Sequence, residues 1–182
     1  MSYLRKTLQG GRQLPPPLWI MRQAGRYLPE YRAVRQKFPD FMEFCLTSEA
    51  VTTVTLQPIN RFDFDAAIIF CDILIVPHVL GQTVRFIENE GPRLAQVDWP
   101  TFLESANKQS VLPSLESVFK AITLTRQALP KHKTLIGFCG SPWTIACYMM
   151  QGGKVGAGLT KLDPVLTDRK STRLNSSHGY RS

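Results

Sequence analysis

The chain has 182 residues, 43% of them hydrophobic and 20% charged, a composition typical of one globular domain with a substantial core. It contains no run of about 18 apolar residues, so no membrane span is predicted. The net charge of +8 does not indicate a nucleic-acid-binding surface, because half of this excess comes from four basic residues in the last 14 positions, which contain no acid.

The first informative stretch, residues 15–32, reads PPPLWIMRQAGRYLPEYR. We expect residues 18–21 to form a short buried strand, which ends abruptly at Arg22 and Arg26 on either side of Gly25. Guanidinium groups bind carboxylates bidentately and stay charged at every relevant pH. The pair therefore indicates a receptor for an anion, with ion pairs to nearby glutamates as the structural alternative.

Helix and strand patterns alternate along the rest of the chain. We predict a short basic helix, a first amphipathic helix, a buried strand, a hairpin arm, a second amphipathic helix, a second strand and a final helix, over residues 31–37, 48–60, 66–70, 83–87, 110–129, 134–138 and 143–150 respectively. Ser48 and Ser141 are the expected helix N-caps. This alternation predicts an α/β fold with a parallel sheet, in which functional groups gather at the carboxyl ends of the strands.

Asp72 interrupts the most apolar stretch of the chain, directly after a predicted strand. A buried carboxylate is costly unless it is paired or strongly hydrogen-bonded. An arginine partner is one explanation; acceptance of several N–H groups, or stabilisation of a cationic intermediate, is the other. Tyr148 and Phe138 are also aromatic candidates for a site, although such residues more often belong to a core.

No metal or cofactor site is predicted. The four cysteines form no CxxC pair, and His78 has no Cys or His at metal-ligand spacing. Free thiols in a reducing compartment are expected, which favours a cytoplasmic protein.

Three segments in order carry a resemblance to a known family. PLWIMRQAGRYLPEYR, AAIIFCDILIVPHVLGQTVRF and GFCGSPWTIACYMMQGG resemble motifs of uroporphyrinogen decarboxylase, and the similarity runs from about residue 14 to residue 153. The resemblance implies a (β/α)8 TIM barrel, of which this chain would form only the N-terminal half. It also implies a cytoplasmic homodimer when full length, without membrane or nucleic-acid partners.

The reaction implied by this resemblance removes the four acetate carboxyl groups of uroporphyrinogen III, giving coproporphyrinogen III, without a metal or organic cofactor. Arg22 and Arg26 match the substrate-carboxylate arginines, and Gln23, Ala24 and Gly25 complete the binding loop between them. Asp72 matches the aspartate that accepts the pyrrole N–H groups, while Phe138 and Tyr148 match substrate-contacting aromatics. Asp72 and Arg22 are thus the expected catalytic residues.

The resemblance divides the chain into residues 1–153, the N-terminal part of the barrel, and residues 154–182. The second segment matches nothing in the family, so we expect a disordered or foreign tail. The family also uses a hydroxyl residue and a histidine from its second half, which this chain lacks; we therefore expect the 182 residues alone to be inactive.

Two other functions remain open from the sequence. One is a corrinoid- or cobalamin-linked methyltransferase on a related barrel, which would hold zinc through His and Cys ligands. The other is a non-catalytic remnant that binds porphyrinogens or other polyanions, which would keep Arg22 and Arg26 but would not depend on the charge of Asp72.

Overall fold

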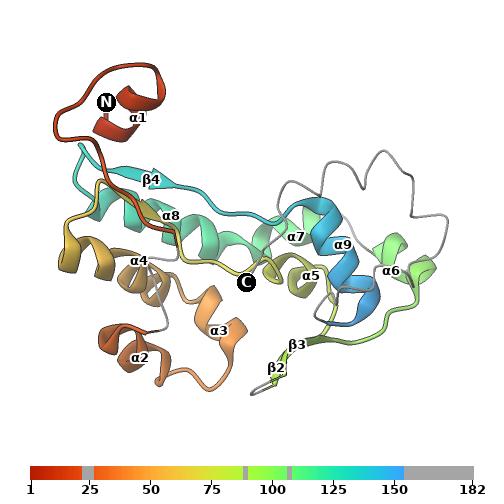
Figure 1. Ribbon diagram of the computed structural model, residues 1–182. Coiled ribbons are helices and arrows are strands. Elements are labelled where there is room, and N and C mark those ends of the chain that lie inside the picture. Colours follow the sequence, from red (N-terminus) through yellow and green to blue (C-terminus); the bar gives the residue numbers. More distant parts are fainter. Residues whose placement is uncertain (22–26, 88–89, 106–107, 154–182) are drawn as a thin grey trace.

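The computed structural model describes residues 1–21, 27–87, 90–105 and 108–153, without the side chains of residues 108–110. The elements in chain order are α1 (Tyr3–Leu8), α2 (Pro29–Arg35), α3 (Phe41–Leu46), α4 (Ser48–Phe62), β1 (Ala66–Ile68), α5 (Ile75–Val79), β2 (Val84–Ile87), β3 (Gly91–Leu94), α6 (Trp99–Ser105), α7 (Lys108–Ser114), α8 (Glu116–Ala128), β4 (Thr134–Ile136) and α9 (Pro142–Gln151). Figure 1 shows their arrangement.

The sheet that organises the fold is the pair β1 and β4, which run parallel. Ala66 lies opposite Thr134 and Ile68 opposite Ile136, and the Ile69 N–H extends the pairing by donating to the carbonyl of Ile136 at 3.0 Å. A second small sheet joins β2 and β3 as an antiparallel hairpin. The strands predicted over residues 66–70 and 134–138 and the hairpin arm over residues 83–87 are thus confirmed, although no closed barrel is present among the described residues.

Helices α4 and α8 lie side by side along the strand pair (Figure 1). The strand side chains of Ala67, Ile69 and Leu135 face these helices. Ile69 and Leu135 pack with Val51 of α4 and Ala121 of α8. This follows from the alternation of side chains along a strand, which sends every second residue to the same face. One face of the pair is therefore closed by helices.

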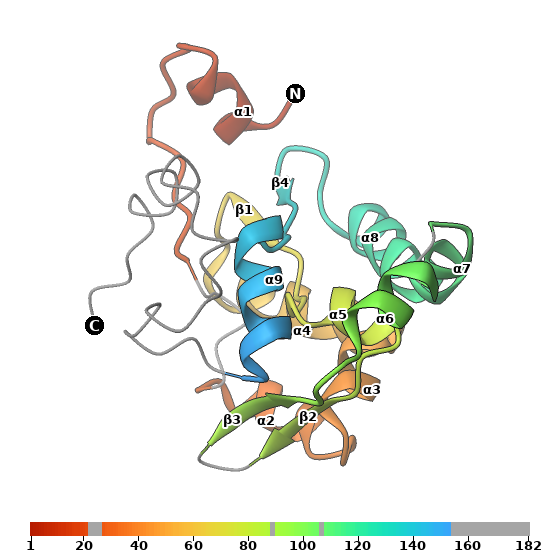
Figure 2. The same ribbon diagram turned by 90° about the vertical axis from the view of Figure 1, so that its right-hand side faces the viewer.

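The largest part of the core lies beyond the carboxyl ends of these strands. It brings together residues from α2, α3 and α4, the segment that leads into α5, the β2–β3 hairpin and α9, namely Leu28, Tyr31, Phe41, Met42, Phe44, Cys45, Ala50, Val54, Leu74, Ile75, Val84, Leu94, Ile145 and Met149. Figure 2 shows α9 beside α5, with the hairpin below. The segments that follow both strands are thus anchored in one common core.

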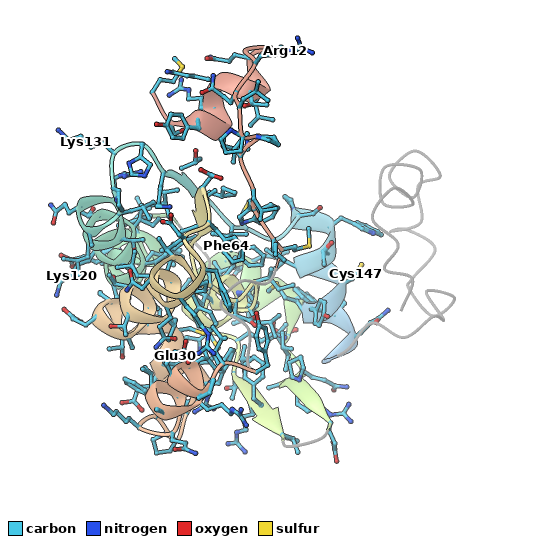
Figure 3. The ribbon with its side chains drawn as sticks, turned by 60° about the vertical axis from the view of Figure 1, so that its left-hand side comes forward. Arg12, Glu30, Phe64, Lys120, Lys131 and Cys147 are labelled. Carbon is cyan, nitrogen blue, oxygen red and sulfur yellow. The ribbon has the colours of Figure 1, made fainter. Side chains whose placement is uncertain are left out.

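A buried lysine links the two segments that enter β1 and β4, at the amino ends of these strands. Lys133, whose side chain is only 5% exposed, donates from Nζ to the carbonyls of Asp63 and Phe64 at 3.1 and 2.7 Å. The same ammonium lies 2.7 Å from the Asp63 carboxylate and, by hydrogen bonding and charge, lowers the pKa of that carboxyl. Phe64, labelled in Figure 3, lies two residues before the start of β1.

The segment of residues 18–21, predicted to be a buried strand, is not one. Leu18, Ile20 and Met21 are between 51% and 61% exposed, and none of the four residues is in a strand. Leu18 pairs with Asp65, donating to its carboxylate at 2.7 Å and accepting from its N–H at 3.0 Å. The preceding prolines have no N–H to extend this pairing, which is one physical reason that the ladder stops there.

The predicted helix over residues 110–129 is two helices, α7 and α8, which meet at Leu115. The sequence predicts an apolar face at Leu112, Leu115, Val118, Phe119, Ile122 and Ala128. That face is partly wrong, because Leu112, Phe119 and Ile122 are 55%, 48% and 39% exposed. The buried positions of α8 are instead Ala121 and Thr125, whose small side chains allow close contact with α4.

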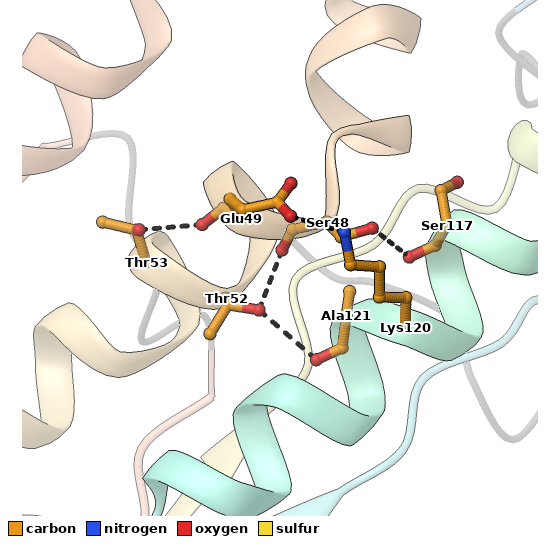
Figure 4. Close-up of polar contacts among 7 residues, drawn as sticks. All are labelled: Ser48, Glu49, Thr52, Thr53, Ser117, Lys120 and Ala121. Atoms are coloured by element: carbon orange, nitrogen blue, oxygen red, sulfur yellow. Dashed lines mark hydrogen bonds and ion pairs between the residues drawn. The ribbon is translucent and has the colours of Figure 1, made fainter.

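The two predicted caps have different outcomes. Ser141 is the N-cap of α9, as expected, although its side chain makes no capping hydrogen bond. For α4 the N-cap is Thr47 instead of Ser48. The Ser48 hydroxyl donates to the carbonyl of Ser117 on α8 at 2.8 Å, so it joins two helices (Figure 4).

Candidate functional site

The candidate site lies where the chain leaves the carboxyl ends of β1 and β4. After β1, the chain turns at Asp72 into α5; after β4, it passes through Phe138, Cys139 and Gly140 into α9. The two turns are in contact, since a Cβ added at Gly140 would lie 3.0 Å from the Cβ of Ile73. Glycine is therefore needed for this close approach.

Asp72 is held by the turn that it begins. Its Oδ1 accepts the Leu74 N–H at 2.8 Å, and its carbonyl accepts the Ile75 N–H at 3.3 Å. Leu74 and Ile75 are each only 2% exposed and belong to the core, so the core holds this turn in place. The carboxylate is partly buried and oriented, which is what an electrostatic role requires.

Thr55 fixes the backbone just before this turn. Its hydroxyl donates to the carbonyl of Val51 at 2.7 Å and accepts the Phe70 N–H at 3.0 Å, and the residue is 1% exposed. The end of β1 is thereby tied to α4, two residues before Asp72. Sequence reasoning missed this role, because nothing in the local pattern pairs a helix threonine with a distant backbone N–H.

The predicted aromatic residues lie on the segments that follow β4. Phe138 is 42% exposed in the loop after the strand, whereas Tyr148 lies on α9, half-buried against the core that also contains Leu74. Helix α9 packs against α5, so Tyr148 and the turn at Asp72 belong to neighbouring elements. The preceding residue of α9, Cys147, is labelled in Figure 3.

The predicted arginine loop, Arg22 to Arg26, lies outside the described residues. Its flanking residues Met21 and Tyr27 are exposed, by 61% and 64%. The structure therefore brings together the turn at Asp72, the loop at Phe138 and helix α9, and leaves the role of the arginines as a prediction.

Two thiols near Asp72 were not singled out from the sequence. Cys71 is half-buried, and burial, followed by the neighbouring charge of Asp72, raises the pKa of its thiol to about 11. Cys139 is exposed in the loop after β4. All four cysteines are free thiols. Within the described ranges, no group of three His, Cys, Asp or Glu side chains is placed to hold a metal.

Of the helices that the structure describes, none is both long and apolar enough to cross a membrane. The fold and site together define an α/β protein with polar groups at the carboxyl ends of adjacent parallel strands, the usual place of active sites in such folds.

Comparison with known proteins identifies the family. Residues 2–165 match the family model described as Uroporphyrinogen decarboxylase (URO-D), and the chain belongs to this family. It is 49% identical over 149 residues to uroporphyrinogen decarboxylases of Brucella ovis, Brucella canis and Brucella suis. These matches cover 81% of this chain but 43% of each relative, so the chain spans less than half of their length. The predicted division at residue 153 stays a prediction.

Proposed function

We propose that the chain supplies the N-terminal part of a uroporphyrinogen decarboxylase, built as a (β/α)8 barrel, that converts uroporphyrinogen III to coproporphyrinogen III. Membership of the family supports this reaction. The parallel strands β1 and β4, connected through α8, support the barrel. The homodimer remains part of the proposal for the complete protein.

The observation that carries the proposal is the orientation of the Asp72 carboxylate. The Leu74 N–H holds Oδ1 from the core side, at the carboxyl end of β1. A carboxylate fixed in this way needs no reorganisation when a positive charge develops beside it. The pyrrole N–H groups of a porphyrinogen are suitable donors to such a carboxylate.

The proposed chemistry begins with protonation of a pyrrole carbon next to the acetate side chain. The resulting cationic ring accepts the electron pair left when carbon dioxide departs, and Asp72 stabilises this cation. Arg22 and Arg26 would bind carboxylates of the substrate, and Phe138 and Tyr148 would contact its rings. Arg22 is the proposed arginine in the proton chemistry, although its high pKa makes it an unusual general acid.

The test is a chimera in which residues 1–153 of this chain replace the matching segment of the Brucella ovis relative. We expect the chimera to decarboxylate uroporphyrinogen, and its Asp72→Asn variant to lose turnover by about 100-fold or more, because the amide keeps the shape but not the charge. Turnover is measured by chromatography of the oxidised products.

The matched control is Asp98→Asn, a substitution at an exposed aspartate just before α6. It should leave turnover unchanged. Both variants should keep the circular dichroism of the chimera. Full turnover by a folded Asp72→Asn chimera would refute the catalytic role and favour a binding function for this segment.

A further inference from the structure

Cys71 and Cys139 take no part in the proposed reaction, yet they lie at equal positions beyond the last paired residues of β1 and β4. Ala66 pairs with Thr134, Ala67 with Leu135 and Ile68 with Ile136. Counting three residues on from the last pair brings both strands to a cysteine. Residues at equal positions on neighbouring parallel strands point to the same face, so the two thiols start from matched positions.

The two segments that follow β1 and β4 remain in contact beyond the last paired residues of these strands. The Ile69 N–H still donates to the carbonyl of Ile136, and Ile73 comes within van der Waals distance of the Cα side of Gly140. Contacts thus lie on both sides of the cysteine positions. The charge of Cys139 is also close enough to contribute to the raised pKa of the Cys71 thiol.

The two thiols differ in access. Cys139 is exposed, whereas Cys71 is half-buried and donates to the carbonyl of Asp72 at 3.6 Å. An oxidant from solvent therefore reaches Cys139 first. Cys71 is then the residue that can react with the oxidised sulfur of Cys139 to form a disulfide.

We propose that Cys71 and Cys139 form a redox-sensitive thiol pair, which a peroxide converts to a disulfide at the edge of the candidate site. Neighbouring strands lie about 4.8 Å apart, within the range of about 4.4–6.8 Å between Cα atoms that disulfides span. The bond would tie the turn at Asp72 to the loop that carries Phe138. The effect on turnover rests on the proposed function; formation of the bond does not.

The reaction proceeds in two balanced steps. The Cys139 thiol attacks hydrogen peroxide, giving a sulfenic acid and one water molecule. The Cys71 thiol then loses its proton, the resulting thiolate attacks the Cys139 sulfur, and the hydroxide that departs takes up a proton to give a second water molecule. Two thiols are oxidised by two electrons, and one peroxide is reduced to two water molecules. Because the attacking species in the second step is a thiolate, this step becomes faster as the pH rises toward about 11.

The test uses the 182-residue chain, purified as a monomer and kept dilute, and treated with hydrogen peroxide. Intact mass should fall by two hydrogen atoms, and peptide mapping should show one cross-link, between Cys71 and Cys139. Dithiothreitol should restore the original mass. Cys71→Ser and Cys139→Ser should each abolish the cross-link, whereas Cys147→Ser, at a buried cysteine of α9, should leave it unchanged.

Three outcomes would overturn the proposal: oxidation of Cys139 to sulfinic acid without a cross-link, a cross-link to Cys45 or Cys147, or a bond between two chains. Mapping of the unsubstituted chain alone decides among these, whether or not the serine variants fold. In the chimera, peroxide should lower turnover reversibly. A chimera without any turnover would refute the proposed function and leave the mapped disulfide standing.

Discussion

Thr55 is the side chain that fixes the backbone two residues before Asp72. It satisfies two backbone groups at once, the carbonyl of Val51 and the N–H of Phe70, in a place closed to water. A buried N–H that loses its acceptor costs its full desolvation penalty, which is larger than the net value of an average hydrogen bond. The threonine is therefore a positioning residue for the turn that follows β1.

Substitution Thr55→Val should lower the free energy of unfolding by about 1–3 kcal/mol, because the Phe70 N–H is left unpaired in a site of nearly the same shape. Urea unfolding followed by circular dichroism measures the change. Thr53→Val is the matched control, since Thr53 makes the same bond within α4, to Glu49, but is exposed (Figure 4). It should change stability by about 0.5 kcal/mol or less. Equal losses in the two variants would contradict the role of Thr55.

Single residues also mark the limit of what the sequence could predict about the site. The position of Asp72 after a strand could be predicted, because a carboxylate inside an apolar run is conspicuous. Its Leu74 partner could not, since that bond depends on the turn into α5. The matching of Cys71 with Cys139 depends on strand register, which neither local pattern contains.

At the scale of elements, the contact between α4 and α8 explains why helix positions were predicted better than helix faces. Sequence periodicity assigned the largest apolar side chains of residues 110–129 to the core. In the structure, polar side chains of α4 reach carbonyls of α8, with Ser48 bonding to Ser117 at 2.8 Å and Thr52 to Ala121 at 3.4 Å (Figure 4). Such contacts require small residues between the helices, so the larger ones point outward.

Enlarging a buried small residue at this contact should therefore be harmful. Ala121→Leu should lower the free energy of unfolding by about 1–3 kcal/mol, because Ala121 of α8 is 1% exposed and packs against Val51 of α4. The control is Ala128→Leu, an exposed position at the end of α8, which should have little effect. Thermal unfolding of both variants provides the comparison, and equal melting temperatures would show that the interface is not tightly packed.

For the whole molecule, the main feature is apolar surface that the described part of the chain leaves uncovered. Leu18, Ile20 and Met21 are exposed on the segment that begins beside Asp65, and Leu103, Leu112 and Phe119 are exposed on α6, α7 and α8. Open strand edges and apolar patches of this kind favour association between chains. They also fit a chain that spans less than half of its relatives.

We therefore expect the 182-residue chain alone to associate as its concentration rises and to show no decarboxylase turnover. Sedimentation velocity measures the association, and Ile20→Lys should shift it toward the monomer by placing a charge on the apolar segment. Leu8→Lys, at an exposed leucine of α1, should shift it less. Measurable turnover by this chain alone would contradict the expectation.

The parallel pairing of β1 with β4 has a consequence for the order of folding. β1 leaves the ribosome well before β4, and the residues between them include α5, the hairpin and the helices α6 to α8. Closing so long a loop costs entropy before any hydrogen bond between the strands forms. Contacts made by the intervening helices must therefore form first and offset this loss of entropy. Until β4 arrives, the backbone of β1 has no strand partner among the described residues, and the turn at Asp72 has nothing to pack against on the side of Gly140.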